Sequence, residues 1–284
     1  NQSSENVIFD DDKVATRGFK LKKSVGAISR NKWLIEDYAI SVVPALRLIQ
    51  LQREEKSKLS SLSFLGLGAP VLGGKSDSEL VALRGGGLFS TKELHKTLVE
   101  LPEAKKEIEV IASYFNQSKL LLEQEATEKN FLTSNPNSYD VISFATHALK
   151  FDELKDSQEP SLVLTLDGAS DGLLTSNEIL GLDLSKTKLV MLSACNTASS
   201  SGYLDTEGYS GLASSFLSSG AKEVLVSHWS VYSQAATDLT TKMMASEEVG
   251  FPRKLQDAMK NLLSSGESLK RHPAYWGAFS IVGN

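Results

Sequence analysis

The chain contains one cysteine, Cys195, which directly follows an apolar run of strand length, 189–194. A similar run, 141–145, is followed two residues later by His147. A thiol with a pKa of about 8.5 is only a few per cent ionised at neutral pH, so it needs a base or a positive field to act as a nucleophile. Imidazole titrates near neutrality, accepts such a proton and returns it to a leaving amine. The two residues therefore form a candidate catalytic dyad.

Each member of the dyad has a competing interpretation. A cysteine within an apolar strand is commonly a small core residue, and only its position at the end of the run favours chemistry. His228 also ends an apolar run, just before Trp229, and is the rival base. His95 and His272 lie in helical or loop contexts and are weaker candidates.

The elements that must position the dyad alternate between strands and helices. Most predicted strands are continuous apolar runs, which is typical of strands covered on both faces. This pattern predicts an α/β fold with a mostly parallel central sheet and helices on both faces. Such folds place their chemistry at the carboxyl ends of the strands. The predicted strands are 38–43, 62–67, 141–145, 161–166, 189–194, 223–227 and 276–282, and the predicted helices begin at Pro102, at Thr175 with Glu178 as a capping box, at Gly208 and at Pro252.

Composition and motifs argue against several classes of function. The 284 residues carry a net charge of −5, which argues against a nucleic-acid or anionic-membrane surface. No apolar run approaches the roughly 18 residues of a membrane span. A single cysteine forbids an internal disulfide and is compatible with the reducing cytoplasm. No P-loop or Cys/His metal cluster occurs, and the glycines at 66 and 68 lack the third glycine of a dinucleotide loop. No cofactor is therefore expected.

Two segments organise the chain. Residues 1–30 are polar and are interpreted as a leading segment or linker, and residues 31–284 as one domain. Because the chain begins at Asn1 rather than Met, we expect it to be a piece of a longer protein. The loop 196–208, after the cysteine, is rich in Ser, Gly and acidic residues. Long loops in this place commonly carry function.

Six stretches in this order resemble one known family, the CHAT peptidases, relatives of caspases and separase. The separation of 48 residues between His147 and Cys195 is also close to the roughly 50 of caspases. The matching stretches are Phe144-Ala-Thr-His147, Asp167-Gly to Glu178-Ile-Leu, Leu192-Ser-Ala-Cys195-Asn-Thr197, Glu207-Gly208, Phe216-Leu-Ser-Ser-Gly220-Ala221 and His272-Pro-Ala-Tyr-Trp276-Gly-Ala-Phe279.

The resemblance implies a caspase-like three-layer α/β/α sandwich. It implies a cysteine endopeptidase that cleaves a protein substrate with His147 and Cys195 as its dyad. Members are commonly joined to an upstream TPR or sensor region, or respond to a separate activator. The resemblance thus implies a regulated effector in a bacterial defence or cell-death pathway.

The expected binding groups lie around the dyad. The backbone N–H groups of Ala148 and Cys195 are the candidate oxyanion site, although the family usually has glycine at position 148. Trp229 and Ser230 are expected to line the peptide-binding edge by backbone pairing.

Specificity is expected to depart from the family pattern. An acidic residue often stands near position 233 in the family and is linked to a basic substrate residue, whereas this chain has Ser233. Asp205 and Glu207 could offer a carboxylate instead, but acidic residues in a polar loop are more commonly just solvated. We therefore expect no strict dependence on Arg or Lys before the cleaved bond.

Two other function classes compete with the peptidase. Ala148 and the altered residues at 232–233 are compatible with a catalytically silent caspase-like module that binds a protein partner. A nucleotide-binding doubly wound domain rests on the fold class alone and is the weakest alternative.

Overall fold

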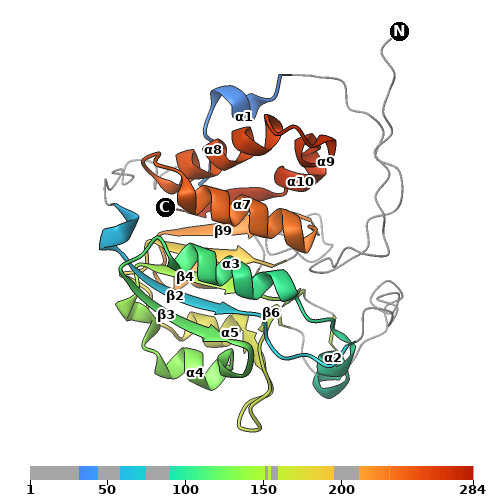
Figure 1. Cartoon of the computed structure of the whole chain (residues 1–284). Coiled ribbons are helices and arrows are strands. Elements are labelled where there is room, and N and C mark those ends of the chain that lie inside the picture. Colours follow the sequence, from blue (N-terminus) through green and yellow to red (C-terminus); the bar gives the residue numbers. More distant parts are fainter. Residues whose placement is uncertain are drawn as a thin grey trace.

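The computed structural model describes residues 32–43, 58–74, 90–150, 153–154, 159–194, 211–229 and 231–283. Across these ranges the centre of the molecule is a seven-stranded sheet with the order β1-β10-β9-β8-β4-β2-β3 (Figure 1). A second sheet has three short strands in the order β5-β6-β7. The strands are β1 (Ser41–Val42), β2 (Ser63–Gly68), β3 (Gln117–Leu122), β4 (Val141–Ala145), β5 (Ala148–Leu149), β6 (Ser161–Val163), β7 (Leu173–Thr175), β8 (Leu189–Ser193), β9 (Glu223–Ser227) and β10 (Phe279–Gly283).

The strands that matter for the site are parallel. β3, β2, β4, β8 and β9 all pair in parallel, whereas β10 pairs antiparallel with β9 and β1 pairs in parallel with β10. Every residue of β4 and β8 is buried, as expected for strands covered on both faces. The prediction of a mostly parallel α/β sheet is therefore confirmed.

Helices cover both faces of the sheet, which gives three layers (Figure 1). One face packs against α3, α7, α8 and α10, and the other against α4, α5 and α6. On the second face Phe144 lies between Phe131 and Phe216, with ring centroids 5.2 and 5.7 Å away. The helices are α1 (Leu34–Asp37), α2 (Thr91–Thr97), α3 (Pro102–Ala112), α4 (Glu128–Thr133), α5 (Ser176–Leu180), α6 (Gly211–Ser218), α7 (Ser233–Ala245), α8 (Phe251–Leu263), α9 (Ser268–Arg271) and α10 (Pro273–Trp276), with 3₁₀ turns at Leu59–Ser61, Glu123–Glu125 and Pro136–Ser138.

Local sequence signals explain where several helices begin and end. Thr175 and Glu178 form the predicted capping box, in which the Glu178 carboxylate accepts the Thr175 N–H at 2.7 Å. Pro102 is the first residue of α3. Gly220 follows α6 with φ of +106°, and a Cβ there would lie 2.9 Å from the backbone nitrogen of Ser185, so glycine is required.

Three expectations about strands were wrong in detail. The predicted strand 161–166 ends at Val163 as β6 and lies in the small antiparallel sheet, because residues 167–172 turn back to pair β7 with it. The predicted strand 276–282 begins later, because Trp276 still belongs to α10. β3 was not predicted at all, since its first three residues are polar and exposed on the edge of the sheet.

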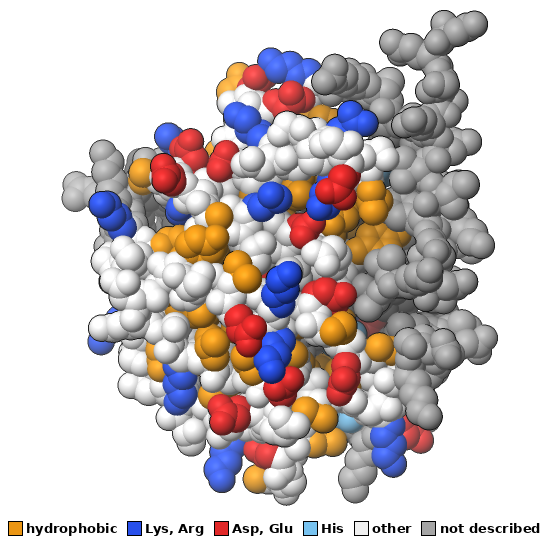
Figure 2. All heavy atoms as spheres, in the orientation of Figure 1, with side chains coloured by type: hydrophobic (Ala, Val, Ile, Leu, Met, Phe, Trp, Pro, Cys, Tyr) orange, Lys and Arg blue, Asp and Glu red, His pale blue; other side chains and the backbone are white. Residues whose placement is uncertain are grey.

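Charged side chains of both signs are interspersed with apolar ones on the face that carries α3 and α7 (Figure 2). Among the residues that the structure describes, this face therefore shows no extended basic area of the kind that binds nucleic acid. Among the helices that the structure describes, none has the length and apolar character needed to cross a bilayer.

Glu223 makes folding stability depend on pH. It begins β9, and burial raises the pKa of its carboxyl to about 7 from 4.5. Between these values the folded chain holds a proton that the unfolded chain has lost, so this residue lowers stability as the pH rises from 4.5 to 7. Over this pH range the free energy of unfolding falls by at most about 3 kcal/mol.

We therefore expect Glu223→Gln, which mimics the protonated carboxyl, to be more stable than wild type at pH 8 and equal to it at pH 4.5. Urea denaturation at the two pH values measures this difference. Glu247→Gln, at an exposed position after α7, is the control and should change neither value. An equal effect of Glu223→Gln at both pH values would contradict the assignment.

Candidate functional site

The carboxyl ends of β4, β8 and β9 meet at one edge of the central sheet. Ala145 at the end of β4 pairs with Ser193 at the end of β8. The next residue, Ala194, accepts a hydrogen bond of 2.6 Å through its carbonyl oxygen from the Oγ of Ser227, the last residue of β9. His147 follows the first of these ends, and the sequence continues to Cys195 from the second.

His147 is buried, with 3% of its surface exposed. Its Nε2 lies 2.8 Å from the carbonyl oxygen of Val99, in the segment between α2 and α3. A carbonyl only accepts, so Nε2 carries the hydrogen and donates it. In the neutral ring the basic lone pair is then on Nδ1. The Val99 carbonyl thus fixes both the orientation of the ring and its tautomer.

The backbone at Ala148 leaves an N–H directed away from the small sheet. The His147 carbonyl accepts the Val163 N–H at 2.9 Å, and Ala148 pairs with Leu162 in the antiparallel ladder. Hydrogen-bonded and non-hydrogen-bonded pairs alternate in such a ladder, so the pair Ala148–Leu162 is a non-hydrogen-bonded one. The Ala148 N–H therefore points away from β6 and is suited to bind an oxyanion.

His228, the rival base, lies on the face of the sheet that α4, α5 and α6 cover. Val224 and Val226 of β9 pack against the cluster that contains α4 to α6, and alternation places His228 on that same face. Its Nε2 lies 2.7 Å from Ser280 Oγ on β10. Partial burial lowers the pKa of His228 below its usual value, which favours the neutral ring.

The two other histidines support local structure. His95 Nε2 lies 3.0 Å from the carbonyl oxygen of Leu164, and a Cβ at Gly172 would lie 2.6 Å from that nitrogen. His272 caps α10, because its Nδ1 accepts the Ala274 N–H at 3.1 Å. These contacts give both histidines local structural roles.

The start of α7 also lies at this edge, because α7 follows the carboxyl end of β9. Ser233, its first residue, is buried, and Trp229, which comes between β9 and α7, is 39% exposed. Cys195, Asp205, Glu207 and Ser230 lie outside the described residues.

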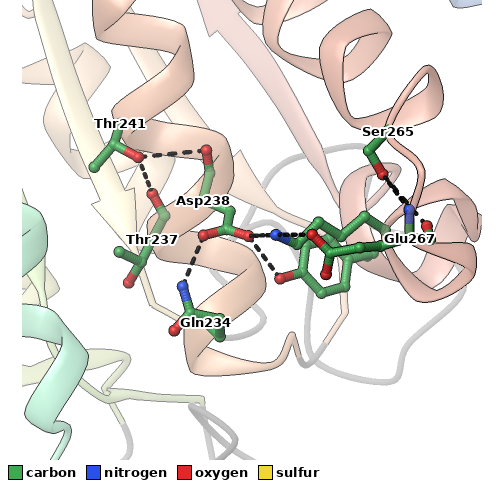
Figure 3. A network of polar contacts seen from close by, with 8 residues as sticks. Gln234, Thr237, Asp238, Thr241, Ser265 and Glu267 are labelled. Atoms are coloured by element: carbon green, nitrogen blue, oxygen red, sulfur yellow. Dashed lines mark hydrogen bonds and ion pairs between the residues drawn. The ribbon is translucent and has the colours of Figure 1, made fainter.

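A polar network holds α7 in place (Figure 3). Asp238 accepts hydrogen bonds from Gln234 Nε2 at 2.7 Å and from the Tyr275 hydroxyl at 2.8 Å, and pairs with Lys270 at 3.2 Å. Lys270 also pairs with Glu267 at 2.9 Å. Burial and the hydrogen bond to Asp238 raise the pKa of the Tyr275 hydroxyl, so it remains a donor. The network joins α7 to α9 and α10 and so fixes the helix that carries Ser233.

Two features at or just before the start of α3 carry no signal in the sequence. Val99 acts through its carbonyl, which every residue has. Glu103, in the first turn of α3, has a buried Oε2 without a hydrogen-bond partner in the described part of the chain. Within those same ranges no group of three His, Cys, Asp or Glu side chains is arranged to hold a metal ion.

A family model for the CHAT domain matches residues 11–284. The chain belongs to the CHAT domain family. Human tetratricopeptide repeat protein 28 is 24% identical to this CHAT domain over 296 aligned positions, which cover 90% of the chain and 11% of that protein. The mouse protein of the same name is 33% identical over 120 positions, which cover 39% of the chain and 4% of that protein. The CHAT domain thus spans about a tenth of the human relative.

Solved structures share the fold of this CHAT domain. Gingipain R, described as an Arg-specific cysteine proteinase, has a TM-score of 0.50 and 11% identity over 84% of this chain and 50% of its own. The separase–securin complex of Saccharomyces cerevisiae has a TM-score of 0.50 and 14% identity over 87% of this chain and 14% of its own. The architecture of the CHAT domain is therefore that of caspase-like peptidases, and the expected fold class is confirmed.

Proposed function

We propose that this CHAT domain is a cysteine endopeptidase with Cys195 as nucleophile and His147 as general base. The observation that carries the proposal is the register between β4 and β8. Ala145, the last residue of β4, pairs with Ser193, the last residue of β8. His147 and Cys195 each come two positions after these paired residues. Continuing the ladder by two residues on both strands would place them opposite each other.

The facing pattern of the two strands supports the same pairing. Val141 and Ala145 on β4, and Leu189 and Met191 on β8, all belong to the core cluster on the α3 and α7 side. Side chains alternate between faces along a strand, so by count positions 147 and 195 fall on that side as well. His228 falls on the opposite side, which favours His147 as the base.

The proposed reaction has two stages. Nδ1 of His147 takes the thiol proton as the sulfur of Cys195 attacks the scissile carbonyl carbon. The N–H groups of Ala148 and Cys195 stabilise the oxyanion. The C–N bond then breaks, the imidazolium gives its proton to the leaving amine, and a thioester remains. Water, activated by His147, hydrolyses the thioester, so no cofactor is needed.

Substrate binding is proposed at the segment between β9 and α7. The exposed Trp229 would contact the peptide, with Ser230 pairing to its backbone and Ser233 lining the pocket for the residue before the cleaved bond. Asp205 and Glu207 belong to the loop after the nucleophile and are proposed to flank the same site.

The biological setting is proposed from the relatives. Tetratricopeptide repeat protein 28 is much longer than this domain, and the separase match comes from a complex with a second protein. We therefore propose a protein substrate, and control by an attached repeat or sensor region or by a separate activator.

A peptide library derived from a proteome tests the function. The purified wild-type chain is expected to generate new peptide N-termini, which mass spectrometry identifies. Iodoacetamide labelling of Cys195 is measured on the same sample. No new termini, together with labelling no faster than that of a free cysteine, would contradict the proposal and favour a silent module that binds a protein partner.

A further inference from the structure

Glu107 is a carboxylate in the middle of α3 that the proposed reaction does not use. Its surface is fully buried, and its neighbours in the helix, Ile108 and Ile111, belong to the apolar core between α3, α7 and the sheet. A buried polar group lowers the stability of a fold unless hydrogen bonds replace those that it made with water. A carboxylate in this place therefore depends on partners that stay in a fixed position.

Two hydroxyl groups of α7 donate to this carboxylate. Its Oε2 accepts a hydrogen bond of 3.1 Å from Thr237, and its Oε1 accepts one of 2.8 Å from Thr240. Both threonines are buried, with 6% and 0% of their surface exposed. Residues three apart lie on the same face of a helix in successive turns. Glu107 thus bridges two turns of α7 with its two oxygen atoms.

This bridge fixes the position of α3 along α7. The apolar contacts between the two helices are non-directional, so they favour contact without sharply selecting one alignment. Hydrogen bonds need a defined distance and angle. A slip of α7 by one residue would move it about 1.5 Å along its axis and turn its contact face by about 100°, which breaks both bonds to Glu107. A fully satisfied buried network makes a core rigid and specifies one arrangement.

Both helices begin at the candidate site and lie side by side (Figure 1). Val99, just before α3, accepts the hydrogen bond of 2.8 Å from His147 through its carbonyl oxygen. α7 begins at Ser233, shortly after the exposed Trp229. The alignment of α3 with α7 therefore sets the place of Trp229 and Ser233 relative to His147.

We propose that Glu107 is a positioning residue, which holds the segment between β9 and α7 in place relative to the general base His147. The inference rests on the proposed function, in which that segment binds the substrate. In this role Glu107 acts through the two helices that it joins, without touching the reacting groups. The network around Asp238 ties α7 to α9 and α10, so polar contacts hold α7 to α3 and to these two helices.

An apolar variant separates positioning from stability. It combines Glu107→Met with Thr237→Val and Thr240→Val, and so removes both sides of the polar contact. Replacing both partners by apolar groups of similar shape is nearly neutral or stabilising, so its melting temperature is expected to equal or exceed that of wild type. Its kcat/KM for a peptide that wild type cleaves is expected to fall about 10- to 100-fold, because a misplacement of about 1 Å costs that much.

Two further variants are the matched controls. Glu107→Gln keeps an oxygen that accepts from one hydroxyl and an amide that donates to the other, so its kcat/KM should stay within about threefold of wild type. Glu109→Met, on the exposed side of the same helix, should change neither activity nor melting temperature.

A distance measurement tests the alignment of the helices without turnover. Spin labels are attached through Glu109→Cys on α3 and Lys242→Cys on α7, both exposed, in the Cys195→Ala chain, which leaves no other thiol. Double electron–electron resonance is expected to give one narrow distance distribution when Glu107 is present or replaced by Gln. In the apolar variant the distribution is expected to shift or broaden.

The two measurements distinguish this inference from the proposed function. A distance that changes in the apolar variant, with no peptide cleavage by wild type, would support the alignment of α7 by Glu107 and contradict the peptidase. An unchanged distance, an apolar variant as active as wild type, or a loss in Glu107→Gln as large as in the apolar variant would overturn the role of Glu107 and leave the peptidase standing.

Discussion

Cys195→Ala is expected to abolish peptide hydrolysis, with a loss on the order of 10⁶-fold in kcat, as found when a nucleophile is removed from a comparable catalytic unit. The reason is that this thiol is the only one in the chain, so no other sulfur can form the thioester. The measurement is the rate of hydrolysis of a peptide that wild type cleaves.

The fold of this variant is expected to survive. The substitution removes one sulfur atom from the residue that follows the described part of β8, and the core residues of β8 that precede it are unchanged. Circular dichroism and the melting temperature should therefore match wild type. A folded Cys195→Ala protein that still cleaves the peptide would show that the nucleophile lies elsewhere.

His147→Gln is expected to lower kcat/KM by about 10²–10⁴-fold, the usual effect of losing a positioned general base. Glutamine keeps a side-chain donor that can approach the Val99 carbonyl, but it cannot take the thiol proton. The effect on activity should therefore exceed any effect on folding. Steady-state kinetics with a peptide that wild type cleaves measure it.

His228→Gln is the matched control for this experiment. His228 also follows the end of a strand, but it lies against Ser280 on the other face of the sheet. We expect its kcat/KM to stay within about threefold of wild type, as for substitutions that leave the transition state untouched. A larger loss in His228→Gln than in His147→Gln would exchange the roles of the two residues.

The buried strands were the easiest part of the fold to predict. β4 and β9 begin and end at the predicted residues, because each is a short apolar run bounded by polar residues. β3 escaped prediction because an edge strand can expose polar side chains such as Lys119 and still pair through its backbone. The antiparallel β10 and the small sheet depend on where the chain turns back, which apolar periodicity does not encode.

The candidate site also contains residues that the sequence indicated and residues that it did not. The ends of apolar runs indicated His147 and Cys195 as a dyad, and this pairing stays a prediction because Cys195 lies outside the described residues. The Val99 carbonyl could not be found from the sequence, because a backbone group leaves no trace in residue type. Glu103 was missed for a different reason. An acidic residue in the first turn of a helix is ordinary, and only its buried Oε2, which has no hydrogen-bond partner in the described part of the chain, distinguishes it.

The most direct test of the dyad is the pH dependence of Cys195 alkylation by iodoacetamide, because the chain has no other thiol to react. A neighbouring imidazole lowers the pKa of a thiol. The wild-type rate is therefore predicted to reach half its maximum well below about pH 8.5, and His147→Gln to shift that midpoint up to about pH 8.5, the value of an unperturbed cysteine. Identical profiles for wild type and His147→Gln, both centred near that value, would contradict the pairing of His147 with Cys195.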